Sequence, residues 1–232
     1  MTFADTVARA RAENRTLLSE VEAKAALAEA GLHVTATTLA TSRDEAVAQA
    51  AAAGYPVALK VVSPNIAHKS DVGGVRLGLA DGEAVAEAYD AILASVKAAQ
   101  PDAIVGGISV QQMAAPGTEV IVGMTTDAQF GPVMMFGLGG IMVEVLGDVA
   151  FRLIPLGEGD AEDMIDEIQG RQVLEGVRGQ RPVDMAALEG TLRGVSAFVA
   201  AHPDVQELDL NPVIASPEGA VAVDARIVLA EG

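Results

Sequence analysis

The chain has 232 residues, of which 50% are hydrophobic and only 3% aromatic, and it contains neither tryptophan nor cysteine. Its 32 acidic and 15 basic residues give a formal net charge of −17, which argues against nucleic acid as a partner, because that affinity depends on basic side chains that neutralise phosphates. The missing cysteines exclude disulfides, thiolate metal sites and cysteine nucleophiles, and they fit a cytoplasmic location.

The N-terminal sequence MTFADTVARARAENRTLLSE is charged early and lacks an apolar core, so we expect no secretory signal. The longest uncharged apolar stretch, Phe130 to Val143, contains glycines and a proline and falls short of the roughly 20 residues that a membrane-spanning helix needs. We therefore expect a soluble protein that does not contact a membrane.

Helices and strands alternate in the first half of the chain. Capping boxes at Ser19–Glu22 and Ser42–Glu45 predict helices that end at Gly31 and Gly54. Strands are predicted at His33–Leu39, Val57–Val62, Val75–Leu79 and Ile108–Met113, and a further helix at about Asp81–Ala98. This half is of the α/β class.

The segment Ala114–Gly117 interrupts this pattern and predicts a boundary between two lobes, residues 17–114 and 115–232, with residues 1–16 as an N-terminal extension. In the second lobe, strands are predicted at Thr118–Met124, Pro132–Phe136, Val205–Leu210, Val213–Ala215 and Ala220–Val223, and helices at Ala161–Gln169 and Met185–Ala201. The whole chain is thus expected to be a two-lobed α/β (α+β) protein.

A lysine stands near the end of an apolar strand, in the run YPVALKVVSPNIAHKSDVGG from Tyr55 to Gly74. Because a buried ammonium without a partner costs several kcal/mol, Lys60 either meets an anion or extends from the strand end into solvent. The following Gly73 and Gly74 either bring backbone amides to a phosphate or form a hairpin turn or bulge. Together these residues favour a phosphate site.

Oxygen-bearing side chains gather near the C-terminus. Strand alternation puts Glu207, Asp209 and Asn211 on one face, and Asp224 follows a later strand. They are either ligands of a hard cation such as Mg²⁺ or the solvated edge of a sheet that ends in a turn. With the lysine and glycines, they would grip a metal–triphosphate.

His68 has polar neighbours on both sides and the glycine pair after it. It is either an ordinary surface residue or a general base, anion binder or phosphoryl acceptor. The residues alone leave these alternatives open.

Several segments resemble the ATP-grasp β subunit of NDP-forming acyl-CoA synthetases, in particular the ADP-forming acetate–CoA ligases, which are related to succinyl-CoA synthetase. The resemblance runs from about Leu17 to Leu229 and is carried by EVEAKAALAEAGL, GYPVALKVVSPNIAHKSDVGGVRLGL, VQQMAAPGTEVIVG, FGPVMMFGLGGIMVEVL and ELDLNPVIAS with AVDARIVL. It implies an ATP-grasp fold that binds a nucleotide between its two lobes.

The resemblance also implies roles for individual residues in nucleotide binding. Lys60 matches the lysine that contacts nucleotide phosphates, and Gly73 and Gly74 match the glycine loop that covers them. Gln111, Gln112 and Met113 match the hinge that meets adenine, and Glu119 matches the acidic residue at the ribose hydroxyls. Asn211 and Asp224, with Asp209 alongside, match the Mg²⁺ ligands, and Glu207 belongs to the same set.

The resemblance further implies a phosphohistidine relay. The reaction is acid + CoA + ATP to acyl-CoA + ADP + phosphate, in either direction, and a histidine of a CoA-binding α subunit carries the phosphoryl group from acyl phosphate at the subunit interface. His68 resembles the second histidine that passes this group to ADP, while Gly139, Gly140 and Glu144 match a segment that faces the α-subunit site.

No CoA-binding glycine signature is present, so we expect a catalytic complex with a separate α subunit, α2β2 by analogy. A stand-alone ATP-grasp carboxylate–amine ligase and a non-catalytic nucleotide-binding regulatory module are the rival interpretations. The first would have no evident need for His68, and the second would not need both the histidine and the metal ligands.

Overall fold

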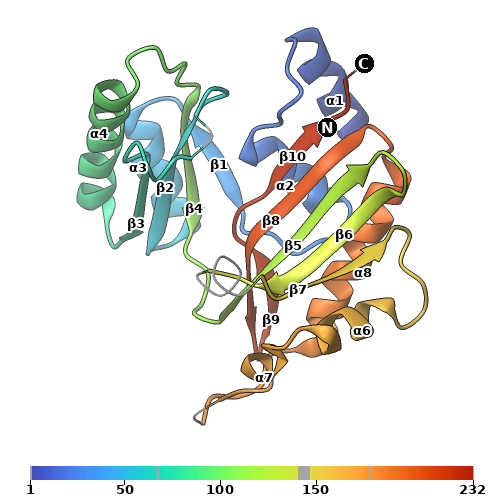
Figure 1. The fold of residues 1–232 in the computed structure, drawn as a ribbon. Helices are drawn as coiled ribbons and strands as arrows, with labels where there is room; N and C mark the ends of the chain where they lie inside the picture. Colours follow the sequence, from blue (N-terminus) through green and yellow to red (C-terminus); the bar gives the residue numbers. More distant parts are fainter. Residues whose placement is uncertain (1, 67, 141–146, 178, 232) are drawn as a thin grey trace. The chain divides into compact units, whose positions relative to one another are not determined.

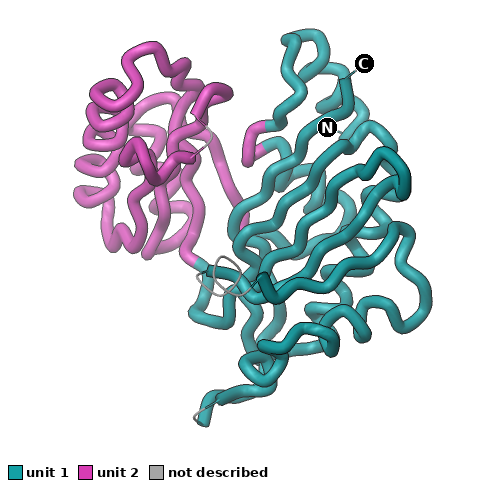
Figure 2. The backbone as a smooth tube through the Cα atoms, viewed as in Figure 1, with its two compact units in different colours: residues 1–18, 22–34, 114–232 teal, residues 19–21, 35–113 magenta. Residues whose placement is uncertain are grey.

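The computed structural model describes residues 2–66, 68–140, 147–177 and 179–231. The chain forms two compact units, unit 1 with residues 1–18, 22–34 and 114–232 and unit 2 with residues 19–21 and 35–113 (Figure 2). Each unit has its own sheet and its own hydrophobic core, which confirms the expected mixed α/β class.

Unit 2 is a four-stranded antiparallel sheet with the order β1-β4-β2-β3 (Figure 1). Its elements are β1 (Thr37–Ala40), α3 (Arg43–Ala53), β2 (Val57–Val62), β3 (Val75–Leu79), α4 (Gly82–Ala99) and β4 (Gly107–Gln112). Apolar side chains of β2 and β4 pack with those of α3 and α4 in one core, so the helices cover one face of this sheet. The opposite face carries Lys60, Ser109 and Gln111, which alternate with the core residues along the two strands.

The predicted helix start at Ser42 is confirmed. The Ser42 hydroxyl accepts the backbone N–H of Glu45 at 3.2 Å, and the Glu45 carboxylate reaches back to the N–H of Thr41 at 2.7 Å. Gly54, with φ +86°, follows the last turn of α3. The sequence therefore specifies both ends of this helix.

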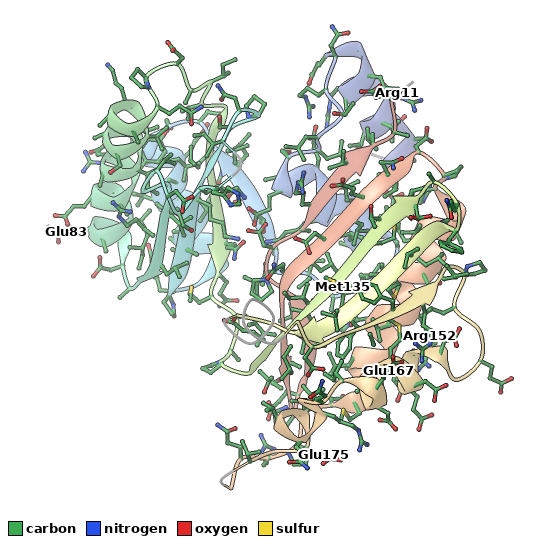
Figure 3. The ribbon with its side chains drawn as sticks, viewed as in Figure 1. Arg11, Glu83, Met135, Arg152, Glu167 and Glu175 are labelled. Carbon is green, nitrogen blue, oxygen red and sulfur yellow. The ribbon has the colours of Figure 1, made fainter. Side chains whose placement is uncertain are left out.

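Unit 1 is built on a six-stranded antiparallel sheet with the order β10-β8-β5-β6-β7, in which β9 also pairs with β8. Its strands are β5 (Thr118–Asp127), β6 (Gly131–Leu138), β7 (Val149–Leu153), β8 (Val205–Ser216), β9 (Gly219–Ala222) and β10 (Arg226–Leu229). Its helices are α1 (Phe3–Ala12), most of α2 (Glu20–Glu29), α6 (Asp160–Glu167), α7 (Arg171–Leu174) and α8 (Met185–Ala201). Helices α6 and α8 contribute to the core of this sheet, and Arg152 of β7 donates to Glu167 of α6 at 2.8 Å (Figure 3).

The N-terminal residues expected as an extension are instead an integral part of unit 1. A capping box between Thr2 and Asp5 begins α1, and Phe3 is buried with its ring centroid 5.1 Å from that of Phe198 in α8. The expected lobe of residues 17–114 is divided differently as well, because most of the segment before residue 35 belongs to unit 1. The apolar face of α1 and α2 explains this division, since both helices bury side chains in the unit 1 core.

The strand predicted at His33–Leu39 is divided between the two units. The His33 carbonyl accepts the N–H of Ala222 at 2.9 Å in unit 1, whereas β1 begins only at Thr37, where it pairs with β4 of unit 2. The segment predicted as one strand therefore makes backbone hydrogen bonds in unit 1 at its start and in unit 2 at its end.

The two strands predicted at Val205–Leu210 and Val213–Ala215 are one continuous strand, β8. Its register with β5 shifts between Val120 and Val122, opposite Asn211 and Pro212, where proline has no N–H to donate. The extra residue of this bulge keeps Leu210 and Val213 on the same buried face despite their odd spacing.

Candidate functional site

The Lys60 side chain is buried in unit 2. Lys60 lies in β2 opposite Ser109 of β4, on the sheet face away from α3 and α4, and only 7% of its side chain is exposed. Its ammonium donates to a carboxylate oxygen of Glu20 at 2.8 Å. The charge is therefore neutralised inside the protein, and the alternative that Lys60 extends into solvent is wrong for this structure.

Glu20 is a buried residue that the sequence analysis did not single out. It is the first residue of α2, its side chain is 2% exposed, and its second carboxylate oxygen accepts from Lys69 at 2.8 Å. One carboxylate thus bridges the lysine of β2 and the lysine beside His68. The sequence offers only a weak signal for this residue, a glutamate inside a capping-box pattern, which marks a helix start but not a buried ion pair.

The loop that carries His68 is closed by its own backbone. The N–H of Gly74 donates to the Lys69 carbonyl at 2.7 Å, and the N–H of Gly73 donates to the Ser70 carbonyl at 3.0 Å. Both amides expected to meet a phosphate are therefore engaged within the loop, and the residues join β2 to β3 in a hairpin, as the alternative interpretation held. The His68 side chain is exposed.

The two glycines are sterically required where they lie. Gly73 has a φ of +67°, a conformation that favours glycine, and a Cβ at Gly74 would lie 2.5 Å from a methyl carbon of Val61. The Arg76 guanidinium also donates to the Gly73 carbonyl at 2.9 Å. The loop is thus fastened to β2 and β3 on both sides.

The expected adenine hinge lies at the end of β4. Gln111 is buried and its side-chain oxygen lies 3.4 Å from the hydroxyl of Thr37, whereas Gln112 is exposed. The N–H of Met113 donates to the Pro56 carbonyl at 3.0 Å. In this structure the Met113 amide is therefore used within unit 2, which ends at this residue.

Glu119 and the Gly139–Gly140 turn lie together in unit 1. The N–H of Gly139 donates to the Glu119 carbonyl at 2.7 Å, and a Cβ at Gly139 would lie 2.9 Å from that of Glu119. The exposed Glu119 carboxylate thus marks the start of β5 beside the turn after β6. Glu144 lies outside the described residues.

The expected metal ligands come together in the sheet of unit 1. Asn211 is exposed at the bulge of β8, and the N–H of Val223 donates to the carbonyl of Pro212 at 2.9 Å, which holds the residue before Asp224 close to that bulge. Asp224 in turn accepts the N–H of Ala225 at 2.9 Å.

Burial raises the pKa of the Asp209 carboxyl, Arg226 opposes this shift, and the negative charges of Asp224 and Glu207 add to it. Arg226 lies directly opposite Asp209 across β8 and β10 and is 3.5 Å from the Glu207 carboxylate. These acidic side chains are therefore close enough to repel one another, and Arg226 offsets part of that repulsion.

The donor set fits a hard cation that is only partly coordinated by protein. An amide oxygen and two carboxylates are the ligand types that Mg²⁺ takes, with waters and phosphates completing the shell. Among the described residues, no group of three or more His, Cys, Asp or Glu side chains is arranged to hold a metal by itself. Within the same part of the chain, no helix has the length and apolar character to cross a bilayer.

Comparison with known proteins gives consistent matches over nearly the whole chain. The model of the ATP-grasp domain family matches residues 9–229. The chain is 44% identical over 223 residues to the acetate–CoA ligase [ADP-forming] I subunit beta of Pyrococcus furiosus, covering 96% of each. It is 45% identical over 201 residues to acetate–CoA ligase [ADP-forming] I of Archaeoglobus fulgidus, covering 87% of this chain but 29% of that longer protein.

A solved structure of acetyl-coenzyme A synthetase 1 from Ca. Korarchaeum cryptofilum, in complex with coenzyme A and Ca-AMPCP, superposes with a TM-score of 0.95 at 46% identity, covering 97% of this chain and 99% of that one. A second structure of the same protein, with coenzyme A and Mg-AMPPCP, has its phosphohistidine segment pointing towards the nucleotide binding site. It has a TM-score of 0.87 at 42% identity and covers 98% of this chain and 100% of that one.

Proposed function

We propose, from the premise that this chain belongs to the ATP-grasp family of ADP-forming acetate–CoA ligase β subunits, that it binds ATP or ADP with Mg²⁺ in an acyl-CoA synthetase. The reaction is carboxylic acid + CoA + ATP to acyl-CoA + ADP + phosphate, in either direction. The observation that carries the proposal is the buried Lys60 ammonium on the polar face of the unit 2 sheet, at the position where the family resemblance expects a nucleotide phosphate.

Lys60 would contact the phosphates from unit 2, and Glu119 would accept hydrogen bonds from the ribose hydroxyls. The segment Gln111–Met113 would meet adenine through its backbone. Gly73 and Gly74 would lie in the loop beside the phosphates, and their amides donate to the Ser70 and Lys69 carbonyls. Their contribution would be to hold the loop that faces the phosphates, and phosphate contact through these amides would require the loop to open.

Asn211 and Asp224, with Asp209, would hold Mg²⁺. When bound, the cation supplies positive charge that offsets the charge on the phosphate oxygens. The clustering of acidic side chains in unit 1 supports this assignment: burial is the main cause of the raised pKa of Asp209, and the negative charges of Asp224 and Glu207 add to the shift, a contribution that a cation would offset. Arg226, 3.5 Å from the Glu207 carboxylate, offsets part of the negative charge of these side chains.

His68 would relay the phosphoryl group. A histidine nitrogen of the partner subunit releases phosphoryl to a ring nitrogen of His68, and that new N–P bond then breaks as an ADP phosphate oxygen accepts the group. The neutral ring is nucleophilic near pH 7, and the exposed position of the His68 side chain suits transfer between subunits. The solved relative with a phosphohistidine segment directed at its nucleotide site supports a mobile phosphohistidine in this family.

The partner would be a CoA-binding α subunit, in an α2β2 assembly, with the acyl phosphate at the subunit interface. The longer relative from Archaeoglobus fulgidus, of which this chain covers 29%, supports the need for further domains. Gly139 and Gly140 would lie near this partner's site, and Glu144 would orient the phosphorylated imidazole.

The test combines the chain with the CoA-binding subunit of the same organism, CoA, Mg-ATP and a panel of carboxylic acids, and measures acyl-CoA and ADP. Wild type is compared with His68→Ala and with the control His33→Ala, whose side chain has no proposed role. We expect acyl-CoA only when both subunits are present and a large loss of turnover in His68→Ala alone. Acyl-CoA formation by the chain alone would contradict the need for a partner, and unchanged turnover in His68→Ala would remove the relay.

A further inference from the structure

The carboxylate of Glu20 joins two lysines that are far apart in the sequence. Glu20 Oε1 accepts from Lys60 Nζ and Glu20 Oε2 accepts from Lys69 Nζ, both at 2.8 Å. The side chain of Glu20 is 2% exposed, and the side chains of Lys60 and Lys69 are 7% and 24% exposed. These are charge-assisted hydrogen bonds in a region with little water, where such bonds are strong and directional.

Lys69 connects this ion-pair cluster to the histidine loop. Lys69 follows His68 directly, and its carbonyl accepts the N–H of Gly74, the contact that closes the loop onto β2. The Lys69 side chain and its backbone are thus held on two sides, by Glu20 and by Gly74. A shift of Glu20 would therefore be transmitted both to the ammonium of Lys60 and to the backbone that carries His68.

We propose that Glu20 is a positioning residue for phosphoryl transfer, which holds the Lys60 ammonium and the His68 loop in a fixed mutual arrangement through its two ion pairs. This inference rests on the proposed function, because it assigns Glu20 to the same phosphate site. Glu20 itself does not contact the transferred group. It acts through Lys60 and Lys69.

The charges of the cluster predict a distinctive kinetic effect. Lys60, Glu20 and Lys69 together carry one net positive charge, and Glu20→Gln raises this to two while preserving the shape of the side chain. The extra positive charge attracts a nucleotide phosphate at least as well as before, whereas the two ammoniums repel each other and lose their fixed geometry. We therefore expect Glu20→Gln to lower kcat without weakening the binding of ATP.

Glu22→Gln is a matched control. Glu22 is two residues further along α2, its side chain is 13% exposed, and its carboxylate accepts from Arg9 at 2.8 Å and from Arg15 at 3.1 Å in unit 1. The Glu22→Gln variant therefore also removes the charge of a largely buried, doubly paired glutamate, but one whose two arginine partners belong to unit 1. A loss of stability alone should affect both variants alike.

The first experiment measures Mg-ATP binding to the chain by calorimetry and turnover in the complex with its CoA-binding subunit. For Glu20→Gln we expect kcat to fall roughly 10- to 100-fold, while the Kd for ATP stays within about threefold of wild type or decreases. Lys69→Met, which leaves the pair between Glu20 and Lys60 intact, should give a smaller fall in kcat. Glu22→Gln should retain wild-type kcat and Kd.

The second experiment measures hydrogen exchange of the backbone amides in the His68 loop. In Glu20→Gln the amides of Gly73 and Gly74 should exchange faster, while the amides of α4 keep their protection. Equal kcat in Glu20→Gln and Glu22→Gln, or a uniform rise in exchange across unit 2, would overturn the positioning role. If wild type itself neither bound ATP nor turned over, the proposed function would fail instead, so the two failures are distinguishable.

Discussion

The backbone N–H of Gly74 donates to the carbonyl of Lys69 at 2.7 Å, and a Cβ placed on Gly74 would lie 2.8 Å from that same oxygen. A residue with a Cβ at position 74 could therefore not make this hydrogen bond without a shift of the Lys69 carbonyl. Since Lys69 follows His68, the bare backbone of Gly74 determines how closely the histidine loop approaches β2. This glycine is required for a close approach and not for an unusual φ, because it is Gly73 that has the positive φ.

Gly74→Ala should open the loop. The added methyl group would clash with Val61 and the Lys69 carbonyl, so we expect the free energy of unfolding to fall by about 1–3 kcal/mol. We also expect the amides of residues 73 and 74 to lose protection from hydrogen exchange. Urea denaturation and exchange measurements test this. The control Gly190→Ala in α8, where no atom lies within 4 Å of the added Cβ, should instead stabilise the chain by about 0.5–1 kcal/mol. Wild-type exchange in Gly74→Ala would contradict the close approach.

Much of the fold follows from local sequence signals. The bounds of β2, β3 and α8 agree with the prediction residue for residue, because apolar alternation, glycines and a capping Asp184 all point to the same limits. Strand periodicity likewise predicts the positions of Lys60 within β2 and of Asp209 within β8, whereas Asp224 lies between β9 and β10.

The remaining features depend on contacts between distant residues. Glu20 lies 40 residues from Lys60 and 49 from Lys69, so no local pattern reveals that one carboxylate pairs with both. The hydrogen bonds from the Gly73 and Gly74 amides to loop carbonyls likewise form only when the loop is closed. The burial of α1 was missed although Thr2 and Asp5 have capping-box spacing and Phe3, Val7 and Ala10 lie on one face.

Glu45 gives the stability of unit 2 an acid dependence. Its pKa is lowered by the hydrogen bond from the Thr41 N–H, then by that from the Thr41 hydroxyl, while burial opposes the shift. Because the folded pKa is below the unfolded one, the unfolded chain binds more protons in the window between them, and stability rises with pH there. The contribution is present above the ordinary glutamate pKa and is lost as pH falls through the lowered value.

Glu45→Gln should therefore be less stable than wild type near neutral pH, and the difference should shrink as the pH falls through this acidic window. Urea denaturation of both proteins at a series of pH values measures the difference. A gap that stays constant down to the most acidic pH at which both proteins remain folded would show that the ionised carboxylate is not responsible.

Phe3→Ala tests whether the N-terminal helix is part of the unit 1 core. The ring of Phe3 packs edge-on against that of Phe198, with 5.1 Å between the ring centroids, and its centroid lies 4.5 Å from that of the His202 ring. Its removal should cost about 3–5 kcal/mol, as expected for a buried phenylalanine, and thermal and urea denaturation measure this. Ala8→Ser on the exposed face of the same helix should cost only about 0.5 kcal/mol. Equal costs would mean that α1 is peripheral after all.

Arg226→Met tests whether the acidic side chains of unit 1 form a cation site. Arg226 offsets charge on Glu207 and Asp209, so without it the carboxylates repel more strongly, and we expect a loss of at most about 1 kcal/mol in the absence of Mg²⁺, since the pair is largely exposed. A bound cation replaces this positive charge, and by mass action millimolar Mg²⁺ should stabilise Arg226→Met more than wild type.

Thermal denaturation with and without Mg²⁺ measures this difference. Arg193→Met is the matched control, because Arg193 is similarly exposed and pairs with Glu189 at 2.7 Å on α8, away from the proposed ligands. This control should lose a comparable amount of stability, and Mg²⁺ should stabilise it no more than it stabilises wild type. If Mg²⁺ raised the Tm of both variants and wild type equally, Asp209, Asn211 and Asp224 would not be the residues through which the cation acts.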